Sequence, residues 1–100
     1  MADFSDLISL THQDFLPLLG ERFDLALADG VMPLRLVEVT PPARIPGGRD
    51  QFSLIFKSGE QRAVPQGTYA LDHAHAGGLA LFIVPVARDA DGVSYQAVFA

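Results

Sequence analysis

The segment from Glu21 to Thr40 constrains the fold most strongly, because its residue pattern is that of a β-hairpin. Asp29-Gly30 is a strong signal for a two-residue type I′ turn, in which both central residues adopt positive φ. This turn predicts a register with three apolar pairs on one face: Leu25 with Leu34, Phe23 with Leu36, and Leu27 with Met32. On the other face, the same register sets Asp24 opposite Arg35 as a cross-strand charge pair.

The C-terminal residues predict a second hairpin, made of Leu79–Arg88 and Val93–Phe99. With a four-residue loop over Asp89–Gly92, three apolar pairs share one face: Val86 with Tyr95, Val84 with Ala97, and Phe82 with Phe99. The opposite face also carries apolar side chains, namely Leu81, Ile83 and Val98, beside Ser94 and Gln96. A strand that is apolar on both sides is usually covered twice. The N-terminal helix and a protein partner are the two candidate covers.

A short helix is predicted over Thr11–Leu19. Thr11 is suited to cap its first turn, and Gly20 is suited to the left-handed residue that ends it. Pro17 removes one backbone hydrogen bond from the helix, so we expect barely two turns.

Two further strands, Gln51–Lys57 and Gly67–His73, bring the expected number to six. The chain of 100 residues fits one domain, with residues 1–10 expected as a flexible N-terminal segment. Six strands joined without helical crossovers predict a mainly β fold. We expect an antiparallel six-stranded meander, closed as a small barrel or packed as a sandwich, with one short N-terminal helix.

Composition excludes several classes of function. The chain has no cysteine, so disulfides and thiolate sites are excluded. The net charge is -5, and the seven basic residues are scattered along the sequence: Arg22, Arg35, Arg44, Arg49, Lys57, Arg62 and Arg88. Because phosphate binding needs clustered positive charge, neither nucleic acid nor a membrane is expected as a partner. No motif indicates a cofactor.

The N-terminus lacks the basic start and the long apolar stretch of a secretory signal, and it contains Asp3 and Asp6. The longest apolar run, Leu79–Ala87, has the length of a strand and not of a membrane span. We therefore expect a soluble protein that is cytoplasmic at synthesis. Such a protein can still be incorporated into a particle or an export apparatus.

The one cluster that suggests chemistry is Asp72, His73 and His75. Two histidines at alternate strand positions point to the same side, and with a carboxylate they are weak candidates for a metal site. A further ligand is available only from distant residues such as His12, and two ordinary surface histidines are the simpler interpretation. No nucleophile motif or catalytic triad is present, so we do not expect an enzyme.

Several short motifs resemble, in order and spacing, a small bacterial family of unknown function. They are Leu10-Thr11 with Phe15 and Gly20–Phe23, Gln51–Leu54, Pro65–Tyr69 with Leu71–His73, and Phe82–Pro85 with Asp89–Gly92 and Tyr95–Phe99. The resemblance carries no functional residues, because the family has no assigned activity. It implies a neighbourhood of tail-fibre or tail-collar genes in phage-like clusters, and hence a role in assembling or accompanying such a structure.

The leading hypothesis is a non-enzymatic structural or assembly module that binds a protein partner, or a second copy of itself. It would use an apolar β-surface or an open strand edge. The interface candidates are Leu81, Phe82, Ile83, Val98 and Phe99. Two alternatives stay open: a small-ligand-binding β-barrel, and an unrecognised metal-dependent enzyme at the histidine pair.

Overall fold

The computed structural model describes residues 12–40 and 51–99. The predicted N-terminal segment 1–10 and the capping role of Thr11 lie outside the described residues, as do residues 41–50. Two short helical turns, α1 (His12–Phe15) and η2 (Leu16–Leu18), precede six strands. The strands are β1 (Arg22–Leu27), β2 (Gly30–Val39), β3 (Phe52–Ser58), β4 (Gly67–His73), β5 (Gly77–Asp89) and β6 (Gly92–Phe99).

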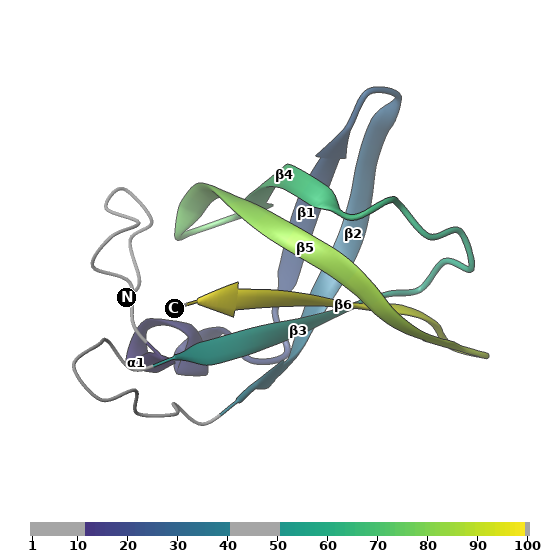
Figure 1. Cartoon of the computed structure of the whole chain (residues 1–100). Helices are drawn as coiled ribbons and strands as arrows, with labels where there is room; N and C mark the ends of the chain where they lie inside the picture. The colour runs from purple at the N-terminus through teal and green to yellow at the C-terminus, as the bar shows by residue number, and fades with distance from the viewer. Residues whose placement is uncertain (1–11, 41–50, 100) are drawn as a thin grey trace.

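The six strands form a closed antiparallel barrel in the order β1-β2-β3-β6-β5-β4 (Figure 1). This confirms the mainly β, six-stranded prediction, and of its two alternatives the barrel is correct. The order is not that of a simple meander, because β3 pairs with β6 and not with β4.

Closure of the barrel depends on a short ladder between β1 and β4. Its described pairs are Asp24 with Asp72 and Leu25 with Leu71. The other ladders contain between five and seven pairs each. The β1–β2 hairpin continues past this short ladder and projects from the barrel at one end (Figure 1).

The predicted register of the first hairpin is wrong by two residues. Ala28 and Asp29 form the turn, so Phe23 faces Leu34 and Leu25 faces Met32. The turn is not type I′, since no described residue other than glycine has positive φ. A shift of two keeps every side chain on its face. The apolar face is therefore correct, although Asp24 lies opposite Pro33 and not opposite Arg35.

The predicted register of the second hairpin is right near the turn and wrong beyond it. Ala87 faces Ser94 as expected, but a β-bulge at Val86 brings Pro85 opposite Tyr95. A shift of one residue reverses the two faces of a strand. The apolar side chains of β5 that point into the barrel are therefore Leu79, Leu81 and Ile83, and not Phe82, Val84 and Val86.

The barrel interior is filled by large apolar side chains. Those that are almost fully buried include Phe23, Leu25, Met32, Leu34, Leu36, Leu54, Phe56, Leu71, Ile83, Val93 and Tyr95. From β3, Phe52, Leu54 and Phe56 contribute to the same core.

The helical segment packs against one end of the barrel. Phe15 is fully buried, and its ring centroid lies 5.2 Å from that of Phe99 and 6.0 Å from that of Phe52. The chain changes from α-helix to 3₁₀-helix at Leu16, one residue before Pro17, which matches the backbone hydrogen bond that proline cannot make. Gly20 has φ +83°, as predicted for the residue that ends the helix.

Candidate functional site

His73 is a buried polar side chain held by three hydrogen bonds. It ends β4 with 4% of its surface exposed, and its Nε2 lies 2.5 Å from Oε1 of Glu21. Its Nδ1 accepts hydrogen bonds from the backbone N–H groups of His75 (3.2 Å) and Ala76 (3.0 Å). The ring proton of the neutral imidazole is therefore assigned to Nε2, which donates it to Glu21.

This arrangement gives His73 a structural role. Both ring nitrogens are occupied, one by a carboxylate and the other by two backbone donors. Neither nitrogen is free to coordinate a metal ion or to take a proton from a substrate. The side chain instead ties the β4–β5 turn to the residue that precedes β1.

The three weak metal candidates do not converge. Asp72 is exposed on the outside of the barrel, while its neighbour His73 is buried. The rings of His73 and His75 lie 6.1 Å apart, and His75 is in the turn after β4. Within residues 12–40 and 51–99, no three His, Asp or Glu side chains are placed to hold a metal ion together.

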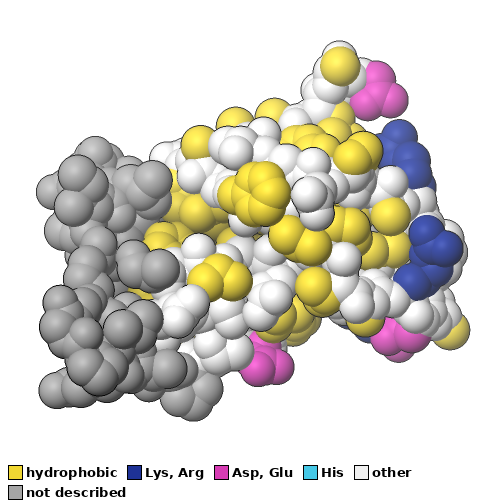
Figure 2. All heavy atoms as spheres, viewed as in Figure 1, with side chains coloured by type: hydrophobic (Ala, Val, Ile, Leu, Met, Phe, Trp, Pro, Cys, Tyr) yellow, Lys and Arg dark blue, Asp and Glu magenta, His cyan; other side chains and the backbone are white. Residues whose placement is uncertain are grey.

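The outside of β5 and β6 carries an exposed apolar surface. We define the outer apolar face as Phe82, Val84 and Val86 of β5 with Val98 of β6. Phe82 is 54% exposed, Val86 50% and Val98 55%. Val84 pairs with Gln96, the last described pair of the β5–β6 ladder, so Phe82 and Val98 lie just beyond its end on their two strands. Figure 2 shows hydrophobic side chains gathered in the middle of one side of the molecule, with charged side chains towards its margin.

The five interface candidates divide between the inside and the outside of the barrel. Leu81 and Ile83 belong to the core, so their predicted place on an outer face is wrong. The reason is the bulge at Val86, which turns the odd-numbered residues of β5 inward. Phe82 and Val98 are exposed, whereas Phe99 is half-buried and stacks on Phe52 at 4.8 Å.

The last part of β5 has one edge without a described partner strand. Its pairing with β4 ends at Ile83, so the stretch after it is paired only with β6 in the described part of the chain. This edge contains Pro85, the bulge at Val86, and Arg88. Proline, bulges and charges are features that discourage an incoming strand. These features make this edge a poor site for the addition of a strand.

The barrel also assembles a row of basic side chains that is not visible in the sequence. On the outside, Arg22 lies directly opposite Arg35, and Arg35 lies directly opposite Lys57. Arg22 is paired with Asp24 at 2.7 Å, and Lys57 is paired with Asp89 at 2.6 Å. Three of the seven basic residues thus meet on adjacent strands. This cluster was not predicted from the sequence, because it depends on the register of three strands.

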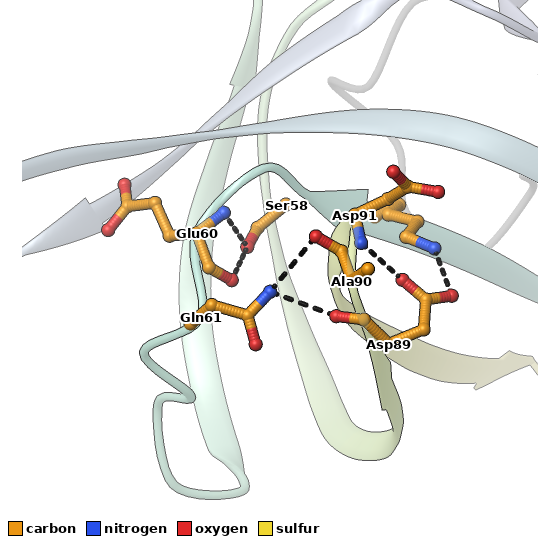
Figure 3. A network of polar contacts seen from close by, with 7 residues as sticks. Ser58, Glu60, Gln61, Asp89, Ala90 and Asp91 are labelled. Carbon is orange, nitrogen blue, oxygen red and sulfur yellow. Dashed lines mark hydrogen bonds and ion pairs between the residues drawn. The ribbon is translucent and has the colours of Figure 1, made fainter.

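An open pocket of about 280 Å³ lies beside this row. It is lined by Arg35, Val37, Lys57, Ser58, Gly59 and Asp91. One side of it is formed by the β5–β6 turn, where Asp89 accepts a hydrogen bond from the backbone N–H of Asp91 at 2.8 Å (Figure 3). Hydrogen bonds from Lys57 and from this N–H lower the pKa of the Asp89 carboxyl below its ordinary value of 3.8.

In the stretches 12–40 and 51–99, no helix has the length and apolar character needed to cross a membrane. A family model described as a domain of unknown function (DUF6916) matches residues 10–99. No curated protein and no solved structure matches the chain.

Proposed function

The chain belongs to this family of domains of unknown function, and we propose that it is a non-enzymatic assembly module that binds a protein partner. The observation that carries this proposal is the outer apolar face, where Phe82, Val86 and Val98 are each at least half exposed. Large exposed apolar side chains that gather on one side of a small domain are typical of protein contact surfaces.

The two alternatives have less support. A small-ligand-binding barrel needs space among its inward side chains, but the inward positions here hold bulky residues such as Phe23, Phe56 and Tyr95. A metal-dependent enzyme at the histidine pair needs free ring nitrogens, and those of His73 are both occupied. A protein-binding role requires no internal space and no free imidazole.

We further propose that the partner is a component of a phage-tail-like assembly. The support for this step is the resemblance of the sequence motifs to a family associated with tail-fibre or tail-collar genes. The outer apolar face is compatible with such a role, because exposed apolar patches often mark contacts between proteins.

The test is affinity purification of the tagged chain from its native host, followed by mass spectrometry. Phe82→Asp and Val98→Asp place a charge in the middle of the outer apolar face. Val31→Asp is the matched control, because Val31 is 58% exposed and lies on the β1–β2 hairpin. We expect one set of proteins, with tail components among them, to be enriched by the wild type and by Val31→Asp but lost with the other two variants.

The partner that binds the outer apolar face could also be a second copy of the chain, and the experiment has to detect this case. Sedimentation analysis of the purified wild type and the same three variants reports on self-association. A dimer that disappears with Phe82→Asp assigns the face to a homo-oligomer. If the wild type is monomeric and no enriched protein depends on Phe82 or Val98, the proposed function is wrong.

A further inference from the structure

The row of basic side chains has a charge arrangement that protein surfaces usually avoid. Like charges set directly opposite each other on neighbouring strands destabilise a sheet. Arg35 has such neighbours on both sides, Arg22 on β1 and Lys57 on β3. Each of these neighbours has a carboxylate of its own, Asp24 and Asp89 respectively. Among the described residues, no carboxylate lies within ion-pair distance of Arg35.

Arg35 is also only partly satisfied as a hydrogen-bond donor. Its Nη1 donates to the backbone carbonyl of Gly20 at 2.7 Å. A guanidinium group carries five N–H donors in a planar fork, which matches the two oxygens of a carboxylate. Arg35 is exposed and lines the open pocket together with Lys57. The central cation of the row therefore has charge and donors to offer to a ligand in this pocket.

We propose that this pocket binds a carboxylate group, which Arg35 holds through its guanidinium. The carboxylate belongs either to a small organic acid or to an acidic side chain of a protein, and the chemistry of recognition is the same. This inference does not rest on the outer apolar face, since the pocket lies over β2, β3 and the β5–β6 turn.

The charges around the pocket favour a single negative charge over a dianion. Lys57 is already paired with Asp89, so Arg35 supplies the unpaired positive charge. Asp91 lines the same pocket, and its carboxylate lies outside the hydrogen-bonded network of the turn in Figure 3. A phosphate with two negative charges is repelled by Asp91 more strongly than a carboxylate with one. The net charge of -5 acts in the same direction.

The experiment is a titration of the ¹⁵N-labelled full chain, followed by the backbone amide shifts of Ser58 and Gly59 at constant ionic strength. The probes are sodium acetate, sodium phosphate, and the blocked peptides acetyl-Ala-Glu-Ala-amide and acetyl-Ala-Gln-Ala-amide. We expect saturable shifts with acetate and with the Glu peptide, but not with the Gln peptide. Tighter binding of the Glu peptide than of acetate assigns the carboxylate to a protein, and the reverse assigns it to a small acid.

Three variants test which charged side chains affect binding. Arg35→Gln is expected to weaken acetate binding by about tenfold, because it removes a charge-assisted pair of hydrogen bonds. Arg22→Gln is the matched control in the same row. It is expected to change the affinity for acetate by less than about twofold, because Asp24 already neutralises Arg22. Asp91→Asn is expected to tighten binding, because it removes the opposing charge.

Several outcomes would overturn the proposal. They are no saturable shift of the wild type with acetate or the Glu peptide, an unchanged affinity in Arg35→Gln, and tighter binding of phosphate than of acetate. The amide spectrum of each variant shows directly whether it has folded, so a loss of binding is not confused with a loss of structure. The outer-face variants Phe82→Asp and Val98→Asp are expected to bind acetate normally, which separates this test from that of the proposed function.

Discussion

The backbone of Gly92 lies directly against the carbonyl oxygen of Ser58. A Cβ atom added to Gly92 would meet this oxygen at 1.8 Å and the carbonyl carbon at 2.9 Å. Gly92 also has φ +136°, a conformation that residues with a side chain rarely adopt. The first residue of β6 therefore has to be glycine for two independent reasons, one of contact and one of backbone conformation.

Gly92→Ala is expected to lower the free energy of unfolding by about 3 kcal/mol or more, since backbone strain and overpacking both contribute. Gly30→Ala is the matched control. Gly30 has φ +144°, but nothing lies within 4 Å of its added Cβ, so only the strain of about 1–2 kcal/mol remains. Urea denaturation of both variants measures the difference. Equal losses would show that the contact with Ser58 is relieved by movement of the loop.

Tyr95→Phe is expected to cost about 1–3 kcal/mol, because the hydroxyl of the buried Tyr95 accepts a hydrogen bond from the backbone N–H of Val64 at 3.0 Å. Without the hydroxyl this buried N–H has no partner. Tyr69→Phe is the comparison, since the Tyr69 hydroxyl donates to Pro65 at an exposed position and its loss should cost less than about 1 kcal/mol. Thermal unfolding measures the loss of stability in the two variants. A larger loss in Tyr69→Phe than in Tyr95→Phe would contradict this prediction.

Substitutions of His73 are expected to separate its two hydrogen-bonding roles. The side-chain oxygen of Asn can replace Nδ1 as acceptor for the turn, while Gln places an amide nitrogen near the position of Nε2. The hydrogen bonds to Nδ1 include one from the buried N–H of Ala76, which would otherwise lose its acceptor. His73→Asn, which keeps an acceptor there, should therefore be more stable than His73→Gln. Hydrogen exchange of the Ala76 amide is the measurement. Faster exchange in His73→Asn than in His73→Gln would contradict this assignment of the two nitrogens.

The Asp89 carboxyl is expected to contribute to acid sensitivity. The hydrogen bonds that it accepts from Lys57 and from the backbone N–H of Asp91 keep its pKa lower in the folded chain than in the unfolded chain. Its contribution to stability is therefore complete above the ordinary pKa of 3.8 and is lost as the pH falls through the lower, folded value. Asp89→Asn should flatten the decline in unfolding free energy at acid pH. An unchanged decline in this variant would assign the acid sensitivity to other carboxyl groups.

The two faces of β5 are expected to respond oppositely to a charge. Ile83→Asp buries a carboxylate in the core and should prevent folding, because an unpaired buried charge costs several kcal/mol. Phe82→Asp, one residue earlier, places the same charge on the outer apolar face and should leave the fold intact. Far-ultraviolet circular dichroism distinguishes these results. A folded Ile83→Asp would show that the bulge at Val86 does not set the inward face.

The sequence was a good guide to the elements and a poor guide to their register. Turn residues and alternating apolar side chains predicted all six strands, and β4 matches its predicted limits, Gly67–His73. Bulges leave no such pattern, since Val37 and Val86 look like ordinary strand residues. The single extra residue at Val86 was enough to reverse the predicted faces of β5.

The surface features depend on pairings between distant segments. Periodicity within one segment does not predict the contact between Glu21, which precedes β1, and His73, which ends β4. The same is true of Arg22, Arg35 and Lys57, which are scattered in the sequence and adjacent in the barrel. The absence of a charge cluster in the sequence was therefore no guide to the absence of one on the surface.

The shortness of the β1–β4 ladder has a consequence for how the barrel comes apart. Its two described pairs join residues that are distant along the chain, while every other ladder is longer. Separation of Leu25 from Leu71 would uncurl the barrel into an open sheet with all remaining ladders intact. Uncurling at this ladder is thus the expected first step of unfolding, and the amides that bond across it should exchange faster than those in the middle of β3.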